Sequence, residues 1–333
     1  MRASDVTSKN KPTSDDGGEA CQKATPRGRA LMKIALRGMG FRELLDELEA
    51  SGASELVGGI HDQMFFDSFW PNPQLDEFLR EAADRGSLDL NPWMEFDQRE
   101  IEQSRFLRIR SHKVLSDSPA DFERMRADLG RLSWLGGDPK RRYRVPERIS
   151  LSKIRLKPNQ IASVGQWTAE YVVPKGVRTI FEEARLSGVD FRPVFNTRTG
   201  AAFDEYFHLY SERVLEFREL DLASPEIRSP HPEEQGYDAL GCLCYDTQTL
   251  EKSLDFNRTG EPLESFEFPD WVVRSSVRDC FVEHRLRGWA FEPVLELGTL
   301  PYEEYCELWM SFYRLLGQCG EHTIRGNRVG PTP

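Results

Sequence analysis

The chain has few cysteines, no long apolar run and no excess of positive charge. Its 333 residues include six cysteines at irregular spacing, unlike the dense framework of a small secreted domain, and we interpret them as reduced thiols. No stretch approaches the roughly 18 to 20 consecutive apolar residues of a membrane-spanning helix, and the N-terminus lacks the apolar core of a secretory signal. These absences predict a cytoplasmic protein with no membrane partner.

The balance of charge disfavours nucleic acid as a partner. The net charge is −11 and the pI is near 5.2, whereas tight binding to nucleic acid needs Lys and Arg to displace counterions from phosphates. The most concentrated basic stretch covers residues 140–148, where five Lys or Arg accompany a single aromatic. We interpret that stretch as a turn-rich linker and predict no nucleic-acid partner. A basic partner protein would suit the acidic chain better.

Recognisable catalytic and cofactor motifs are also missing. The phosphate-binding patterns GxGxxG and GxxxxGK[ST] and the nucleophile pattern GxSxG do not occur, and the six histidines never fall as HxH, HxxxH or HExxH. We therefore predict no catalytic residue, no cofactor and no metal site. One alternative is a hydrolase or nucleotide-processing enzyme that uses His61, Asp62 and nearby carboxylates. Another is zinc held by Cys242 and Cys244, although their CxC spacing lacks a second cysteine pair.

An internal repeat is what the sequence does contain. Residues 172–194 and 272–294 match at a constant offset of 100, with twelve of 23 positions identical. In the first copy, a pair of valines suits a short strand, and Val177, Ile180 and Phe181 then share one face of a helix. Gly188 suits a left-handed cap where that helix would end, and an extended run follows. The similarity continues between residues 203–210 and 302–309, so we expect a repeated unit of about 40 residues.

These patterns predict an α+β protein in which an N-terminal α+β domain precedes two homologous strand-helix-strand modules. Apolar spacing favours helices in residues 41–50 and 72–86, a strand with an exposed basic face begins at Phe106, and a further helix runs from about 116 to 129. The predicted boundaries are a disordered tail (1–31), the N-terminal domain (32–149), the first module (150–220), a linker or insertion (221–262), the second module (263–320) and a flexible C-terminal tail (321–333).

Residues 149–194, "ISLSKIRLKPNQIASVGQWTAEYVVPKGVRTIFEEARLSGVDFRPV", carry a family resemblance. The stretch resembles the "LxGVxFRPV" signature of bacterial immunity-like proteins of contact-dependent toxin systems, which often carry paired CxxCG motifs. This chain has only Cys242 and Cys244, spaced CxC, so the zinc ribbon of such relatives is not implied. The resemblance implies a non-catalytic, cytoplasmic protein that binds and neutralises a cognate toxin.

Most identical positions are explained by packing and turns. The exceptions are Arg178, Glu183 and Arg185, which are polar in both copies; a duplicated binding constellation is one interpretation of them, and local surface pairs on a helix are the one we favour.

Positions where the two copies differ are therefore the candidate partner-binding sites. We predict that Arg192, His284 and Glu292 contact a partner protein; their counterparts are Glu292, Ala184 and Arg192. A second binding hypothesis is a scaffold that holds short peptides in a groove between the copies.

Overall fold

The structure is a computed structural model of the 333-residue chain. It describes residues 31–38, 46, 50–52, 54–60, 63–83, 88–116, 148–165, 169–215, 243–262 and 269–318. Helices and sheets are both prominent within these ranges, which confirms the α+β class. Of the predicted N-terminal tail only Leu31 is described, and the predicted C-terminal tail and the helix expected at 116–129 lie outside the described residues, apart from Ser116.

The N-terminal part of the chain forms a four-stranded antiparallel sheet in the order β2-β3-β1-β4. The strand order, with a helix between β3 and β4, is that of the split βαβ arrangement, and Asp46 and Ala50 between the first two strands are helical. The elements are β1 (Leu31–Gly38), β2 (Ser54–Ile60), β3 (Gln63–Trp70), α2 (Pro73–Ala83) and β4 (Leu88–Glu95).

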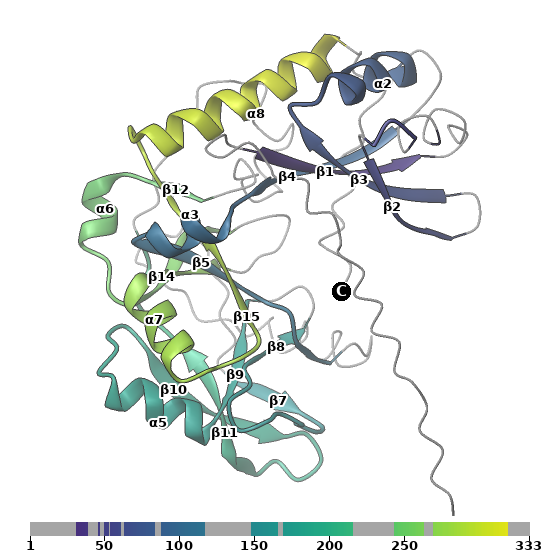
Figure 1. Cartoon of the computed structure of the whole chain (residues 1–333). Helices are drawn as coiled ribbons and strands as arrows, with labels where there is room; N and C mark the ends of the chain where they lie inside the picture. Colours follow the sequence, from purple (N-terminus) through teal and green to yellow (C-terminus); the bar gives the residue numbers. More distant parts are fainter. Residues whose placement is uncertain are drawn as a thin grey trace, which may run out of the picture.

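Two helices from opposite ends of the chain lie side by side on this sheet, α2 and α8 (Leu300–Gln318) (Figure 1). The helix predicted in residues 72–86 is confirmed as α2, and its Leu75 and Phe78 are buried. From α8, the ring of Phe312 meets Trp70 of β3 edge to face, with centroids 5.4 Å apart. The C-terminal helix therefore completes the hydrophobic core of the N-terminal sheet.

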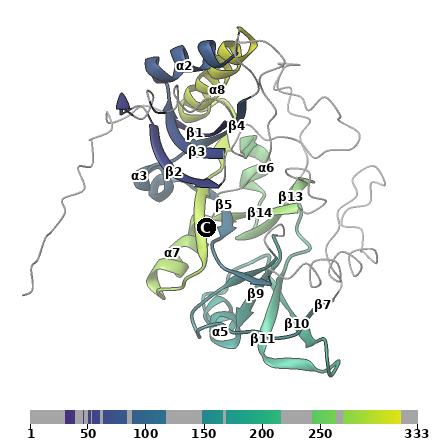
Figure 2. The same cartoon turned by 90° about the vertical axis from the view of Figure 1, so that its right-hand side faces the viewer.

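The rest of the structure is built from two strand-helix-strand modules, each in its own sheet. The first module occupies the end of the molecule farthest from α2 and α8, and the second lies between (Figures 1 and 2). The first consists of β9 (Tyr171–Pro174), α5 (Lys175–Glu183), β10 (Asp190–Asn196) and β11 (Ala202–Tyr210), and the second of β14 (Pro269–Arg274), α7 (Ser275–Glu283), β15 (Trp289–Pro293) and the separate strand β5 (Phe106–Ser111).

Each sheet is extended by short strands. The first has the order β6-β8-β9-β11-β10-β7, the second has the order β13-β14-β5-β15, and β12 pairs with β16. The additional strands are β6 (Val114–Ser116), β7 (Ile149–Leu151), β8 (Ala162–Gly165), β12 (Cys244–Tyr245), β13 (Phe256–Pro262) and β16 (Leu295–Glu296). Two further helices are α3 (Gln98–Gln103) and α6 (Thr247–Glu251).

The central strand of the second module comes from the chain that precedes the first module. In the first sheet β11 lies between β9 and β10, and in the second sheet β5 lies between β14 and β15. The registers agree at an offset of 100, since Val172 faces His208 and Val272 faces Arg108. Residues 106–111 are therefore the structural counterparts of residues 206–211.

This arrangement overturns one sequence alignment and one expected exposure. Residues 203–210 lie in strand β11, whereas residues 302–309 lie in helix α8, so the two stretches are not structural counterparts. The second module already has β5 in its centre, which leaves the later stretch free to form a helix. The strand predicted from Phe106 is confirmed, but its basic face is only partly exposed: Arg110 is half-buried, and Arg108 is only 7% exposed because it is paired with acids of the neighbouring strands.

The predicted domain ranges remain a prediction, although two contacts join elements of different predicted ranges. Strand β5 falls within the range 32–149 but is hydrogen-bonded to β14 and β15 of the range 263–320. Helix α8 falls within the range 263–320 but packs on the N-terminal sheet.

The two modules share one hydrophobic core. In addition, the turn that follows the helix of each module packs closely against a segment beside the other module. Phe181 of α5 and Phe281 of α7 both pack against Trp289 in this core. A Cβ on Gly288 would lie 1.9 Å from the Ile161 carbonyl oxygen, a close approach that only glycine permits. Its counterpart Gly188 approaches Phe256 of β13 in the same way.

Gly188 does not form the predicted helix cap. Helix α5 ends at Glu183, and the left-handed residue that closes it is Arg185, with φ 53°; Gly188 is left-handed as well, with φ 78°, but lies beyond this closing turn. The N–H of Leu186 then donates to the carbonyl of Phe181, which closes the helix end. Gly188 is instead required by the approach to Phe256.

Candidate functional site

A pair of buried acids occupies equivalent places in the two modules. Glu170 directly precedes β9, and Asp270 is the corresponding residue of β14. Each contacts a basic residue of the central strand of its own sheet: Glu170 Oε2 lies 2.5 Å from His208 Nε2, and Asp270 Oδ2 accepts from Arg108 Nε at 2.6 Å. The two acid–base pairs are therefore structural counterparts.

Arg258 adds a second base to the Glu170 pair and joins the two modules. This arginine of β13 is fully buried, and its Nη2 donates to both carboxylate oxygens of Glu170 at 2.8 Å. Its Nη1 donates to the carbonyls of Ala169 and Pro269, one beside each module. The guanidinium also lies 3.8 Å from the ring centroid of Trp271. The counterpart of Arg258 is Ser163, so this link is present on one side only.

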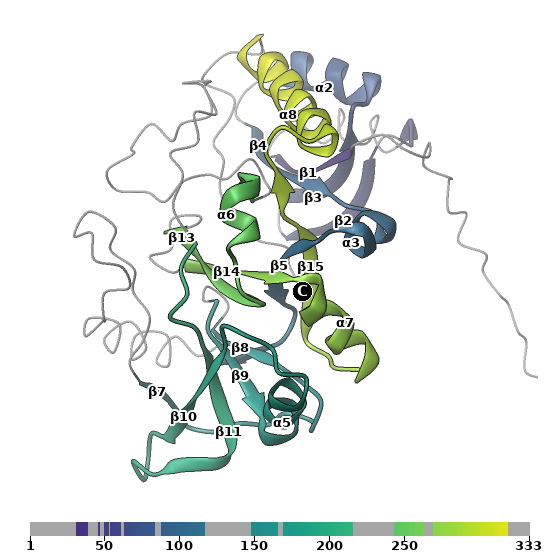
Figure 3. The same cartoon turned by 90° about the vertical axis from the view of Figure 1, so that its left-hand side faces the viewer.

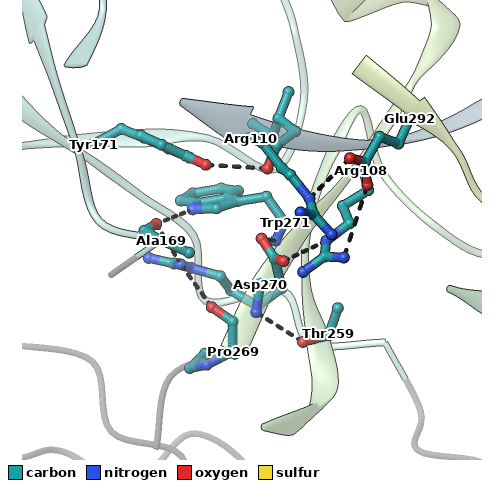
Figure 4. A network of polar contacts seen from close by, with 11 residues as sticks. Arg108, Arg110, Ala169, Tyr171, Thr259, Pro269, Asp270, Trp271 and Glu292 are labelled. Atoms are coloured by element: carbon teal, nitrogen blue, oxygen red, sulfur yellow. Dashed lines mark hydrogen bonds and ion pairs between the residues drawn. The ribbon is translucent and has the colours of Figure 1, made fainter. Parts of the chain in front are cut away.

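Around Asp270 the charges form a more open cluster (Figure 4). Arg108 Nη1 lies 3.7 Å from Glu292, and Arg110 Nε lies 2.9 Å from the same carboxylate. The hydroxyl of Thr259 accepts from the backbone N–H of Asp270. This cluster is partly accessible, because the side chains of Arg110 and Glu292 are 30% and 28% exposed.

The electrostatic environment favours the ionised form of Glu170. Burial raises the pKa of this carboxyl, but the charges and hydrogen bonds of Arg258 and His208 outweigh burial, and the pKa is lowered overall. Burial also raises the pKa of the neighbouring Tyr171, and there it prevails, so that this pKa lies well above its usual value. The Tyr171 hydroxyl remains a donor, to the carbonyl of Ile109.

The buried group of Glu170, Arg258 and His208 stabilises the packing of the two modules. The side chains of Glu170 and Arg258 are 0% exposed and that of His208 is 1% exposed, so none of the three can touch a substrate in this arrangement. A general acid or base must come within hydrogen-bond reach of the group it serves. A buried, fully paired carboxylate instead fixes the relative position of the segments that supply its partners.

The three residues predicted to bind a partner lie on three different elements. Glu292 of β15 belongs to the cluster around Asp270, which the sequence did not indicate. Arg192 of β10 is half-buried; its guanidinium lies 3.2 Å from the ring centroid of Tyr210 and its Nη2 is 3.6 Å from Glu212. His284 is the exposed C-cap residue of α7.

Sequence reasoning missed Glu170, His208, Asp270, Arg108 and Arg258. A signal existed for the first four, because both acids lie at the same offset of 100, two residues before the repeated valines. Their basic partners share that offset, at 108 and 208. Arg258 has no counterpart of its own charge, and nothing in the repeat marks it.

Most residues of the hydrolase and zinc hypotheses fall outside the described part of the chain. His61, Asp62 and Cys242 lie outside it, and Cys244 is buried and forms no disulfide with another described cysteine. Within the described ranges no three His, Cys, Asp or Glu residues gather as metal ligands would. The same ranges contain no helix that is long and apolar enough to cross a membrane.

No protein-family model, curated protein or solved structure matches the chain.

Proposed function

We propose that the chain is a non-catalytic binding protein that neutralises a cognate bacterial toxin by holding it through the first module. The observation that carries the binding function is the setting of Arg192. Its guanidinium lies against Tyr210, beside Glu212, and its side chain remains 30% exposed. Arginine and tyrosine are enriched among the residues that dominate binding at protein interfaces, and an arginine held against a ring loses less freedom when it binds.

Two further features support this proposal. The acid–base pair of Glu170 and His208 is enclosed, so this pair supports the packing of the modules and is out of reach of a substrate. The net charge of −11 would steer the chain toward a basic partner, such as a nuclease toxin, in the cytoplasm. The resemblance of residues 149–194 to immunity-like proteins favours the same function.

The test is protection from a toxin. The candidate toxin is the C-terminal domain of any large secreted protein that proves to be encoded beside this chain, and it is expressed from an inducible promoter in a laboratory host, with and without this chain. The proposal predicts that growth is restored by the wild type, that the two proteins co-purify in a fixed ratio, and that Arg192→Glu restores growth poorly. The matched control is Arg198→Glu, an exposed residue of the β10–β11 turn with the same change of charge. Full protection by Arg192→Glu, or no protection by the wild type, contradicts the proposal.

A further inference from the structure

The second module carries a docked helix, α3, on its outer surface. Arg278 of α7 donates from Nη1 to the carbonyls of Ile101 and Glu102, at 2.5 and 2.9 Å. These carbonyls belong to the last turn of α3, where helix carbonyls lack partners of their own. The Ile101 side chain packs against the shared core beside them, and α3 also contacts β15. One arginine and one apolar contact therefore receive the C-terminal end of a helix.

The first module has the same surface, and no helix of the described part of the chain lies on it. Arg178 is the counterpart of Arg278 at the same position of α5, and its side chain is 36% exposed, against 12% for Arg278. Its guanidinium lies 4.6 Å from the ring centroid of Phe207. Phe207 is half-buried, whereas its counterpart Leu107 is fully buried. Figure 3 shows α3 near α7, while no described helix lies against the outer side of α5.

The chain connectivity explains this difference. In the second module, β5 enters from the N-terminal part of the chain, and α3 is the segment directly before it. In the first module, the equivalent strand β11 follows β10 through the short turn at residues 197–201. That turn has no room for a helix, so the surface around Arg178 has no occupant from the same place in the chain.

We propose that the surface formed by Arg178, Phe191 and Phe207 docks the C-terminal end of a helix of the partner protein. This proposal rests on the proposed binding function and deepens it. Arg178 donates from Nε to Glu182 at 2.8 Å, and its guanidinium carbon lies 5.6 Å and 4.6 Å from the ring centroids of Phe191 and Phe207. Its remaining N–H groups donate hydrogen bonds to the unpaired carbonyls of the last turn of the partner helix, as Arg278 Nη1 does to those of α3. The negative end of the helix dipole adds to this attraction.

The occupant has a defined chemistry. It is a short helix that ends at the surface with free backbone carbonyls, and it places one branched apolar side chain on the rings, as Ile101 does on the core of the second module. An acidic side chain in its last turn would strengthen the contact with Arg178 through a charge-assisted hydrogen bond.

The probe for this surface is a peptide of residues 96–105, "FDQREIEQSR", with blocked ends and a fluorescent label on the first residue. A hydrocarbon staple joins positions 98 and 102, which are exposed and linked by a side-chain hydrogen bond in α3, so the helix forms without change to the docking face. Anisotropy is measured against the full chain. We expect saturable binding, weakened about tenfold or more by Arg178→Ala, because a hydrogen bond to a charged group is lost. The peptide variant Ile101→Ala should also bind more weakly.

Matched variants separate this proposal from its alternatives. Arg198→Ala removes the same charge from the nearby β10–β11 turn and should bind the peptide as the wild type does. The proposal is overturned if the wild type does not bind the peptide, if Arg178→Ala binds it equally well, or if only Arg278→Ala weakens binding, since the peptide would then be replacing α3. A partner that protects cells and binds Arg178→Ala with unchanged affinity would overturn this docking surface while the proposed function stands.

Discussion

Replacement of Glu170 by glutamine tests whether the enclosed charges hold the two modules together. Glu170→Gln keeps the shape of the side chain and removes its charge. In the native protein both carboxylate oxygens accept from Arg258, and one of them also contacts His208. An amide offers a single acceptor oxygen, and its NH₂ group would face another donor.

The expected loss of stability is large because Glu170 is the only acid paired with Arg258 among the described residues. The structure places Arg258 at 0% exposure, and removal of one member of a buried ion pair costs about 3–5 kcal/mol. Asp270→Asn is the matched control at the equivalent place. Its partner Arg108 keeps Glu292 at 3.7 Å and is 9% exposed, so this change should cost about 1–3 kcal/mol.

The assay is equilibrium unfolding in urea at neutral pH, followed by tryptophan fluorescence. A lower free energy of unfolding with an unchanged m value is expected for both variants, and the loss should be larger for Glu170→Gln. Addition of Arg258→Met to Glu170→Gln should recover part of the loss, because the uncompensated charge is removed. A loss below about 1 kcal/mol for Glu170→Gln, or a larger loss for Asp270→Asn, would refute the reasoning.

Three further predictions concern pH, a glycine and a thiol. The pKa of Glu170 is lowered in the folded state, so its contribution to stability is present at neutral pH and is lost as the pH falls through and below about 4.5, its ordinary value; urea titrations across this range should be flatter for Glu170→Gln. Gly288→Ala should lower the free energy of unfolding by more than Gly200→Ala. Both glycines have positive φ, which costs roughly 1–2 kcal/mol for alanine, but of the two only Gly288 has a backbone carbonyl where the new Cβ would lie. Cys280 is buried, and burial together with Glu283 raises its pKa, so iodoacetamide should label it slowly in the native protein and rapidly in urea, as followed by peptide mass spectrometry; rapid native labelling would contradict its packing.

Local periodicity was a sufficient guide to several elements. Val177 and Phe181 marked the buried face of α5, and Leu75 and Phe78 marked that of α2, because an amphipathic helix repeats its apolar residues at three and four positions. Alternation likewise located β5 at Phe106. The positions of these helices and strands depend on residues close together in the sequence, so local patterns are enough to predict them.

The arrangement of the elements could not be read in the same way. The pairing of β5 with β14 joins residues more than 150 positions apart, and no local pattern encodes it. The expectation of an exposed basic face failed for the same reason, since the acid that buries Arg108 comes from β14. Arg192 remained a candidate because it differs between the copies, whereas the surface around Arg178 is conspicuous only when the two modules are compared in space.

The most direct test of the proposed binding mode is isothermal titration of the purified toxin domain with the wild type, Arg192→Ala and Arg198→Ala. The account predicts that Arg192→Ala weakens binding by about tenfold or more, as for an arginine at the centre of an interface, and that Arg198→Ala leaves the affinity unchanged. Equal affinities for all three proteins would contradict the claim that Arg192 of the first module holds the partner.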